Sequence, residues 1–475
     1  MSKTPQHDVV ILGGGLAGLC LALQLRQRFA DLDIVVLERN AHPLPLAAHK
    51  VGESKVEIGA HYLADTLGLR EHFDTAHIRK FGFRFFWTDG RSDLDGVTEL
   101  GVSAVMPTPT WQLDRGILEN HLGELARERG IEFLDGSVVR SIDLGKGDAV
   151  HTVQATVQGE SHTFNARWVI DASGRAGLLR RKLDLTENTG HDGNAVWFRI
   201  DAKLAIDDWC SNDDWKARCI PSEERWRSTN HLCGPGYWVW LIPLGSGAHS
   251  VGIVCDAAMH PIEKMNTFER ALEWLREHQP LVADACEAQR DKLMDFRFLR
   301  GYSYSSKQMF SGDRWALTGE AGVFLDPFYS PGSDFIAIGN TYICELIALE
   351  RAGKPLGPYS RIYEQMFFSF YTNTLSMYRG QYEIFGDAEV MSIKVIWDYT
   401  YYWGVLCQLV FQNRLTDIAL LGELQKEFAE AAQLNLEMQA FFRRWAMLSP
   451  RPNPAILFDQ QELGWFVGMN ATLHD

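Results

Sequence analysis

Three glycines near the N-terminus have the spacing of a site that binds a nucleotide phosphate. Gly13, Gly15 and Gly18 follow an apolar, β-branched run at 8–12 and precede a helical pattern at 19–29. In such a unit the first glycine permits the tight turn, the second lets the backbone approach a pyrophosphate, and the third lets helix and strand pack closely. The positive end of the helix then favours the anion. The expected contacts in this turn are Gly13, Gly15, Leu16, Ala17 and Gly18.

An acidic residue extends this unit toward the ribose. A second apolar run at 33–38 ends in Glu38, about twenty residues beyond the last glycine, where dinucleotide units place a ribose-binding acid. A carboxylate there disfavours a 2′-phosphate, so FAD or NAD is expected rather than NADP. The sequence has no second unit of this type. If the protein is a redox enzyme, its reducing equivalents arrive by a route that lacks a second Rossmann domain.

A turn-rich loop in the second half of the chain could complete the cofactor site. Residues 318–322 and 324–332 hold several glycines and prolines and precede a helical pattern at 334–351. Glycine amides at the positive end of a helix favour an anion or a flavin oxygen. A strand with a Ser-Gly turn and the start of a helix at 116–129 can also abut the cofactor. The expected contacts from these segments are Arg115, Asp171, Gly319, Glu320, Asp326 and Gly332.

Lys80 could do covalent or acid–base chemistry, because a desolvated lysine can act as a nucleophile. Polar and apolar residues alternate at 79–87, which predicts a half-buried strand with Lys80, Gly82 and Arg84 on its polar side. A lysine on such a strand usually faces solvent. Other features of the chain are therefore needed to make this lysine a functional candidate.

Two further segments each allow two interpretations. An apolar run that ends at Pro243 predicts a strand. Its alternation places Trp238, Trp240 and Ile242 on one face, so the tryptophans are either core aromatics or the wall of a pocket. The Gly/Ser loop at 50–55 either reaches the cofactor or lies in solvent before a helix.

Composition excludes several classes of protein. A chain of 475 residues, 46% hydrophobic and 23% charged, is typical of a folded protein with two or three domains, or one large domain with insertions. Its net charge of −15 argues against a nucleic-acid partner, since phosphate requires a basic surface. The eight cysteines form no CxxC or CxxH pair, so zinc and iron–sulfur sites are not expected.

The sequence also predicts a cytoplasmic location. Residues 1–8 lack the basic and apolar regions of a signal peptide, and scattered cysteines suit a reducing compartment. The apolar run at 395–411 is short and interrupted by Asp398 and Gln408. It therefore predicts core or a pocket lid rather than a membrane span.

The order of these patterns predicts an α/β fold. It comprises a FAD-binding, Rossmann-like domain of the hydroxylase (GR2) type, a substrate β-sheet and a helical C-terminal region. The FAD-binding domain is expected at 1–193 and returns at 305–352. Short β-like runs at 194–304 form the substrate sheet, and helical patterns fill 353–475.

Four motifs together resemble those of the flavin-dependent halogenases, over roughly the first 345 residues. The glycine unit matches the family's FAD fingerprint, and Lys80 falls where the family places its active lysine. The stretch 238–243 matches the family's WxWxIP, and 324–332 matches its FxxPxxSxG. The resemblance gives Lys80 a catalytic role. It assigns to the substrate or tunnel the residues Trp238, Trp240, Ile242, Pro243, Phe324, Pro327, Tyr329 and Ser330.

The resemblance implies a two-component enzyme. A separate flavin reductase supplies reduced FAD, which with O2 oxidises chloride or bromide to hypohalous acid. The acid passes through a tunnel to Lys80, which holds it as a haloamine or by a hydrogen bond, and an electron-rich arene such as an indole or phenol attacks it. The two tryptophans keep the arene from the flavin, and the closed tunnel excludes water.

Two departures from the family pattern concern halide and substrate. The resemblance places the halide near the motif serine, at Pro331, Gly332 and Ser333, yet Pro331 has no N–H to donate. Gly332 and Ser333 are the amide donors that remain. Tryptophan halogenases also carry a pocket glutamate that works with the lysine. This sequence shows no match to its surroundings, so free tryptophan bound in their manner is not expected.

Three functions stay open at this point. The leading one is halogenation of a small aromatic, free or bound to a carrier protein, by a monomer or homodimer. Because Pro331 removes a halide donor, the alternative is a FAD-dependent monooxygenase or reductase that does not use halide. The third is a non-catalytic protein that retains FAD.

Overall fold

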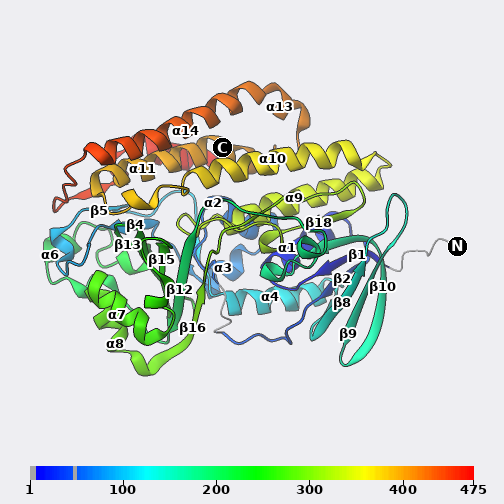
Figure 1. The fold of residues 1–475 in the computed structure, drawn as a ribbon, viewed down its shortest axis with the longest axis horizontal. Helices are drawn as coiled ribbons and strands as arrows, with labels where there is room; N and C mark the ends of the chain where they lie inside the picture. Colours follow the sequence, from blue (N-terminus) through cyan, green and yellow to red (C-terminus); the bar gives the residue numbers. More distant parts are fainter. Residues whose placement is uncertain (1–6, 47–50, 475) are drawn as a thin grey trace.

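The computed structural model describes residues 7–46 and 51–474, and it has the expected α/β fold (Figure 1). Most of the N-terminal stretch 1–8 and the first residue of the 50–55 loop lie outside the described residues. Two large β-sheets lie side by side, and long helices from the C-terminal region run along one side of the molecule (Figure 1).

The first sheet is built on the glycine unit. Its strand order is β7-β2-β1-β10-β9-β8, and β18 also pairs with β10. The pairs made by β1, β2, β7 and β18 are parallel, whereas β8 and β9 extend β10 in antiparallel fashion. These strands are β1 (His7–Leu12), β2 (Ile34–Leu37), β7 (Glu132–Leu134), β8 (Ser137–Asp143), β9 (His151–Val157), β10 (Glu160–Asp171) and β18 (Trp315–Leu317).

Three helices accompany this sheet. They are α1 (Leu16–Arg28), α4 (Arg115–Glu128) and α9 (Gly332–Arg351), and α1 packs against both of the others. Helix α1 begins earlier than the apolar pattern at 19–29 predicts, because the glycine turn leads directly into its first helical turn. Short elements beside the sheets are α2 (Glu57–His61), α3 (Arg70–Ala76), β3 (Ile78–Arg79) and β6 (Trp111–Gln112).

The second sheet has the order β16-β12-β15-β14-β13-β4-β5-β19. Helices α7 (Phe268–His278) and α8 (Pro280–Glu287) pack against this sheet, and the contact forms a hydrophobic cluster separate from the main core. Its strands are β4 (Phe83–Phe86), β5 (Glu99–Gly101), β12 (Gly193–Ile200), β13 (Thr229–Gly234), β14 (Tyr237–Pro243), β15 (His249–Asp256), β16 (Leu293–Leu299) and β19 (Leu457–Asp459). Strands from both ends of the chain therefore join those of 194–304, and the domain boundaries drawn from the sequence stay predictions.

The single half-buried strand expected at 79–87 is wrong. The chain forms β3 and β4 with a break between them, in which Gly82 has a φ of +76°. The side expected to face solvent is buried, since Lys80 is 4% exposed and Arg84 is 0% exposed. The alternation therefore does not separate a solvent-facing side from a core-facing side, because the polar and the apolar side chains are both buried.

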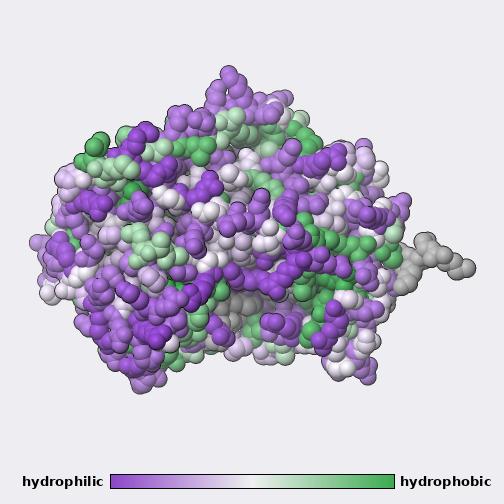
Figure 2. Space-filling view, in the orientation of Figure 1, coloured by the Kyte–Doolittle hydropathy of each residue, from purple (hydrophilic) through white to green (hydrophobic). Residues whose placement is uncertain are grey.

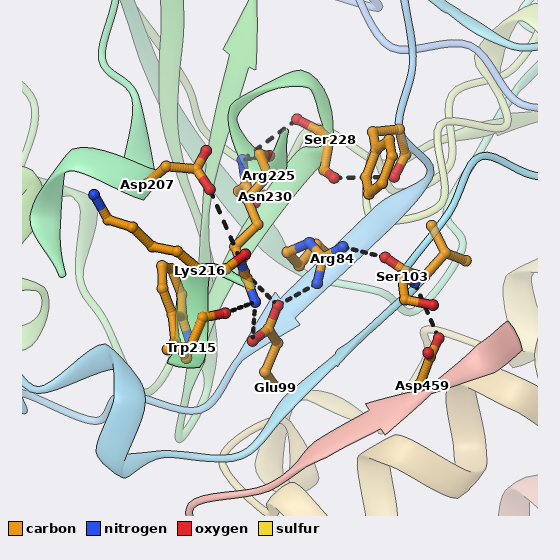
Figure 3. Close-up of polar contacts among 12 residues, drawn as sticks. Arg84, Glu99, Ser103, Asp207, Trp215, Lys216, Arg225, Ser228, Asn230 and Asp459 are labelled. Atoms are coloured by element: carbon orange, nitrogen blue, oxygen red, sulfur yellow. Dashed lines mark hydrogen bonds and ion pairs between the residues drawn. The ribbon is translucent and has the colours of Figure 1, made fainter. Parts of the chain in front are cut away.

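Arg84 is buried because it belongs to an ionic triad. The Glu99 carboxylate accepts hydrogen bonds from Arg84 and from Nε of Arg225, the latter at 2.8 Å (Figure 3). All three side chains are 0% exposed. The triad links β4, β5 and the turn before β13, so it fixes the part of the second sheet where these strands pair.

The C-terminal region is helical, as predicted. The run at 395–411 forms the second half of α11, a π-helical turn at Tyr402–Cys407, and then α12. Among the described helices, none combines the length and apolar character needed to cross a bilayer. Polar side chains cover most of the face in Figure 2. The helices are α10 (Leu356–Ser376), α11 (Ala388–Tyr401), α12 (Gln408–Phe411), α13 (Ile418–Glu423), α14 (Gln425–Leu448) and α15 (Gly464–Ala471).

Candidate active site

A cavity of about 670 Å³, here called the main cavity, is lined by residues of both sheets. Gly13 and Gly15 line it from the end of β1, and Trp238 and Trp240 line it from β14. The loop before α9 contributes a third wall. The fold therefore brings the N-terminal glycine unit and both later motifs to one space.

The glycine turn packs too closely for side chains. Gly13 has a φ of +115°, and a Cβ atom there would lie 2.4 Å from the carbonyl oxygen of Ala172. A Cβ atom on Gly18 would lie 2.0 Å from the carbonyl oxygen of Gly13, so Gly18 lies behind the cavity and lets α1 approach β1. The amide end of α1 is thus open to an anion. The turn residues that line the main cavity are Gly13, Gly15, Leu16 and Ala17.

Glu38 and Arg115 both line the main cavity. Oε2 of Glu38 accepts a hydrogen bond from the amide of Gly14 at 2.7 Å, which fixes the carboxylate at the end of β2. The guanidinium of Arg115 pairs with Glu119 and donates to the carbonyl oxygen of Val51 at 2.5 Å. Arg115 thereby holds the start of the 51–55 loop against α4.

Asp171 does not line the main cavity. One of its carboxylate oxygens accepts from the amide of Ser173 at 3.0 Å and the other from the amide of Leu179 at 2.6 Å. It shapes the turn after β10, whose residues do line the cavity. Gly319 and Glu320, also expected from sequence, lie in the lining.

The N-terminus of α9 presents unused donors to the main cavity. Pro331 is its N-cap residue, and the amides of Gly332 and Ser333 have no acceptor among the described residues. The Ser333 hydroxyl also lacks a partner there, although the residue is only 5% exposed. No atom lies within 4 Å of the position of a Cβ on Gly332. This helix end can therefore accept an anion or a polarised oxygen.

The residues of the main cavity fit FAD. Its volume of about 670 Å³ lies in the range of cofactor sites. The amide end of α1 suits the pyrophosphate, and Glu38 is fixed where a ribose-binding acid is needed. The amide end of α9 leaves donors for the flavin ring or for a halide.

Lys80 lies behind the wall of the main cavity. Its Nζ atom donates to Oγ of Ser54 at 2.9 Å and to the carbonyl oxygen of Lys55 at 3.2 Å, and both of those residues line the cavity. The ammonium also lies 3.4 Å from the centroid of the Phe83 ring. Burial lowers the pKa of Lys80 well below its ordinary value, and the carboxyl group of Glu57 opposes that shift. Lys80 is therefore neutral more often than an exposed lysine.

A small cavity of about 20 Å³, the lysine compartment, is lined by both Lys80 and Glu57. Glu57 is 6% exposed; its Oε1 atom accepts from Nδ2 of Asn470 at 3.3 Å, and its Oε2 atom has no partner among the described residues. Trp403 is in the same lining, and its indole N–H faces the Glu57 carboxyl group and favours its ionised form. Burial raises the pKa of Glu57. The compartment has room for about one water-sized molecule among these groups.

Sequence reasoning missed Glu57 and Lys55. An acid in the first turn of a helix is common because it suits the helix dipole, so nothing local links Glu57 to Lys80. Lys55 is 2% exposed and lines the main cavity, where its Nζ atom donates to the Gly52 carbonyl at 2.9 Å. Burial, with the nearby Arg115, lowers the pKa of Lys55 to about 7. Only the fold brings these side chains to Lys80 and to the cofactor cavity.

The tryptophan pair forms part of the main cavity wall, which favours the second interpretation of that strand. Trp238 is 1% and Trp240 4% exposed, and their ring centroids are 5.7 Å apart. Nε1 of Trp238 donates to the hydroxyl of Tyr382 at 3.1 Å, which fixes the ring. Ile242 also lines the cavity, whereas Pro243 ends β14 outside the lining.

Asp326 connects the two later motifs. Its Oδ2 atom accepts from the hydroxyls of Tyr382 and Tyr302, at 2.6 and 2.5 Å, and from Nε2 of His191 at 2.7 Å. Tyr382 therefore links the carboxylate to Trp238. The carboxylate lines the main cavity and is held rigidly by these donors. Other loop residues in that lining are Phe324, Pro327, Ser330 and Pro331.

A third space, the aromatic compartment, has a volume of about 50 Å³. Tyr329, expected near the tunnel, lines this space, and its hydroxyl donates to Oδ2 of Asp398 at 2.8 Å. Pro331 and Phe335 are common to the main cavity and the aromatic compartment. The aromatic and lysine compartments share the residues Val56, Phe83 and Tyr399. The aromatic compartment is thus separated from each of the other two spaces by a single layer of side chains.

Comparison with protein families gives two matches. The family described as tryptophan halogenase matches residues 98–370, more than half of the chain. The NAD(P)-binding Rossmann-like domain matches residues 11–76, which contain the glycine turn.

Curated proteins with similar sequences are halogenases. Flavin-dependent halogenase chlA of Dictyostelium discoideum is 25% identical over 432 residues, which cover 84% of this chain and 70% of that protein. The 1H-pyrrole-2-carbonyl peptidyl-carrier protein chlorinase of Pseudomonas fluorescens is 28% identical, over 69% of this chain and 72% of that protein. The corresponding brominase of Pseudoalteromonas luteoviolacea is 27% identical, over 70% of this chain and 75% of that protein.

Solved structures show the same fold. Halogenase PltM, in complex with phloroglucinol and FAD, has a TM-score of 0.70 and 18% identity, over 99% of this chain and 95% of that chain. The flavin-dependent halogenase CmlS has a TM-score of 0.60 and 23% identity, over 84% of this chain and 65% of that chain.

Proposed function

This chain belongs to the tryptophan halogenase family, and from that premise we propose that it is a two-component enzyme that halogenates an electron-rich arene. Bound FAD, reduced by a separate flavin reductase, supplies the redox chemistry: FADH2, O2, halide and one proton give FAD, hypohalous acid and water. The single dinucleotide unit in the sequence supports a separate reductase. Chloride and bromide are both candidate halides.

Halide binding is assigned to the N-terminus of α9. The amides of Gly332 and Ser333 and the Ser333 hydroxyl are the unused donors there. Lys55 lines the same cavity and adds positive charge when it is protonated. These groups offset the amide that Pro331 lacks.

The observation that carries the proposal is the position of Lys80. Hypohalous acid formed in the main cavity has only the Ser54–Lys55 wall between it and the lysine. A neutral amine can take the halogen as a haloamine and release water, or it can hold the acid by a hydrogen bond. In either case the ring carbon gains the halogen and loses a proton, so that arene and hypohalous acid give haloarene and water.

Glu57 is the carboxyl group proposed to work with Lys80. Glu57 lines the same small compartment as Lys80, and its carboxyl group raises the pKa of the lysine. The ring proton released during substitution needs an acceptor that water cannot supply in a closed site. A carboxylate at Glu57 can accept that proton, and in its protonated form it can return one to the departing hydroxide.

The arene is proposed to be a phenol or an indole, free in solution. Two curated relatives act on a pyrrole attached to a peptidyl-carrier protein, which makes a carrier-bound pyrrole the second substrate candidate. A carrier arm must reach the compartments beside Lys80, so a carrier-bound substrate requires a wider entrance than a free arene. The active species is proposed to be a monomer or homodimer in the cytoplasm.

One observation favours a second function. Pro331 occupies the N-cap position of α9 and cannot donate to a halide. A FAD-dependent monooxygenase or reductase on the same scaffold would not need that donor. Its products would not change when halide is omitted.

Mass spectrometry of a mixed arene panel tests the proposal. Enzyme, FAD, a generic flavin reductase, NADH and either chloride or bromide are incubated with phenols, indoles and pyrroles, beside Lys80→Ala. Halogen isotope patterns that require halide and vanish in the variant are expected. Oxygenated products without halogen, which persist in Lys80→Ala and without halide, would replace the proposal with the monooxygenase.

A further inference from the structure

The aromatic compartment contains a fully buried hydroxyl, that of Tyr378, with no assigned role. Tyr378 is 0% exposed and lines the compartment, and its O–H hydrogen has no acceptor among the described residues. A buried O–H group that donates to no acceptor is unfavourable, because its donor has lost water without a replacement. Such a group is available to a ligand that enters the compartment.

Both carboxyl groups of the lining are already in use. The Asp398 carboxylate accepts from the hydroxyl of Tyr329, from the ammonium of Lys394 and from Nε2 of Gln439 at 2.7 Å. One oxygen of the Asp334 carboxyl group accepts from the amide of Gly59 at 2.8 Å, and the other accepts from the hydroxyl of Tyr402 at 2.9 Å. Tyr378 is therefore the better candidate for recognition of a polar substituent.

The charge of the lining bears on the charge of the ligand. No lysine, arginine or histidine is among the residues that line the aromatic compartment in the described chain, whereas Asp334 and Asp398 both are. A ligand carboxylate buried there would find no free cation, because the neighbouring Lys394 ammonium already pairs with Asp398, and its lost hydration would make it strongly unfavourable. The compartment therefore suits an uncharged ring.

The size of the compartment favours one ring over two. Its volume of about 50 Å³ is below the roughly 150 Å³ cavity that holds a benzene molecule. Met377 is part of the lining, and an unbranched thioether side chain can rotate to enlarge the space. A bicyclic indole would need a larger displacement of the aromatic walls.

We propose that the aromatic compartment is the binding site for an uncharged, single-ring phenol whose hydroxyl pairs with that of Tyr378. The walls shared with the lysine compartment, formed by Val56, Phe83 and Tyr399, place the ring one side-chain layer from Lys80. The inference rests on the proposed function for the source of the halogen, but binding of the phenol does not require any halogenation.

Equilibrium binding to the FAD-loaded enzyme tests this site. Calorimetric titration or saturation-transfer NMR compares phenol with indole, and 4-hydroxybenzamide with 4-hydroxybenzoate, a pair of similar size that differs in charge at pH 7. Phenol and the amide are expected to bind, with indole and the carboxylate at least about tenfold weaker. Tyr378→Phe is expected to weaken phenol binding about fivefold, as for loss of one neutral hydrogen bond.

Tyr371→Phe is the matched control, because its hydroxyl already donates to the Tyr304 carbonyl at 3.0 Å and lies outside the compartment lining. Equal affinity of Tyr378→Phe and wild type for phenol would overturn the assignment of Tyr378. Equal affinity for the amide and the carboxylate would overturn the uncharged class without needing any variant. Phenol that binds as expected but is never halogenated would leave the site standing and remove the proposed function.

Discussion

The Nζ atom of Lys80 lies 2.9 Å from Oγ of Ser54, so the amine is held by a hydroxyl in the wall of the main cavity. Ser54 is itself fixed by the hydroxyl of Thr229 on β13, 2.8 Å away. Within the described chain no carboxylate lies within salt-bridge distance of the ammonium, and its only other hydrogen bond is to the Lys55 carbonyl. A hydroxyl partner leaves the amine easier to deprotonate than a carboxylate partner would.

Replacing Lys80 is expected to abolish transfer to the arene but not the oxidation of halide. Lys80→Met keeps the volume of the side chain and removes the amine. Haloarene formation is expected to fall about a hundredfold or more, while a soluble halogen trap still detects hypohalous acid. Loss of both signals together would contradict the separation of the two sites.

The wild-type rate is expected to rise with pH through the pKa of Lys80. Burial lowers that pKa from the ordinary value, so the neutral amine forms at lower pH than in an exposed lysine. Initial rates of haloarene formation, measured with saturating reduced FAD, would show this rise, which is the acid limb of the pH–rate profile. A rate that falls over the same interval would mean that the ammonium is the active form.

Glu57→Gln is expected to lower the rate about tenfold to a hundredfold. The carboxylate of Glu57 raises the pKa of Lys80, so its removal moves the acid limb of the rate profile to lower pH. A purely structural role of Glu57 would lower activity without moving that limb. Partial recovery in Glu57→Asp, with the limb near its wild-type position, is the matched control.

The parts of the site that have a local sequence pattern could be predicted from the sequence. Gly13 and Gly18 were predictable because a tight turn and close helix packing can be met only by glycine, and the contacts of both confirm it. The motif at 238–243 could be assigned to a strand from its alternation. Its place in the cavity wall could not be predicted, because it depends on how the strands of the second sheet pair, and no local pattern shows that pairing.

The sequence could not predict sites formed by distant charges. Arg84 looked solvent-facing because alternation usually separates polar from apolar faces, but Glu99 pairs with it from a different strand. Glu57 had no visible link to Lys80 for the same reason. The α2 helix and the break after β3 meet only in the folded chain, where both line one compartment.

Pro331→Ala is expected to strengthen halide binding. The substitution adds an amide donor at the N-cap of α9, beside the unused amides of Gly332 and Ser333. A hydrogen bond to a charged partner contributes about 1.5–3 kcal/mol, so the KM for halide is expected to fall about tenfold or more. Pro358→Ala, in α10 and outside the main cavity lining, is the control. An unchanged KM would place the halide elsewhere.

Glu99→Ala is expected to destabilise the fold by about 3–5 kcal/mol, because Arg84 and Arg225 would remain buried without their shared carboxylate. Urea unfolding would measure the loss. Glu427→Ala, an exposed residue of α14, is expected to change stability by less than about 0.5 kcal/mol. A loss at Glu99 no larger than at Glu427 would contradict a structural role for the triad (Figure 3).

Lys55→Met is expected to stabilise the cofactor-free protein near neutral pH. Burial and Arg115 lower the pKa of Lys55 from 10.5 to about 7, so between these values the unfolded chain binds more protons than the native protein. Native stability therefore rises with pH over that interval, and the penalty from Lys55 is complete only below about pH 7. Methionine fills similar space without titrating, so its advantage is largest at pH 7 or below and vanishes near pH 10.5. Urea unfolding of both proteins at pH 6.5, 8 and 9.5 measures the difference, and a constant difference across these pH values would show that Lys55 does not titrate as described.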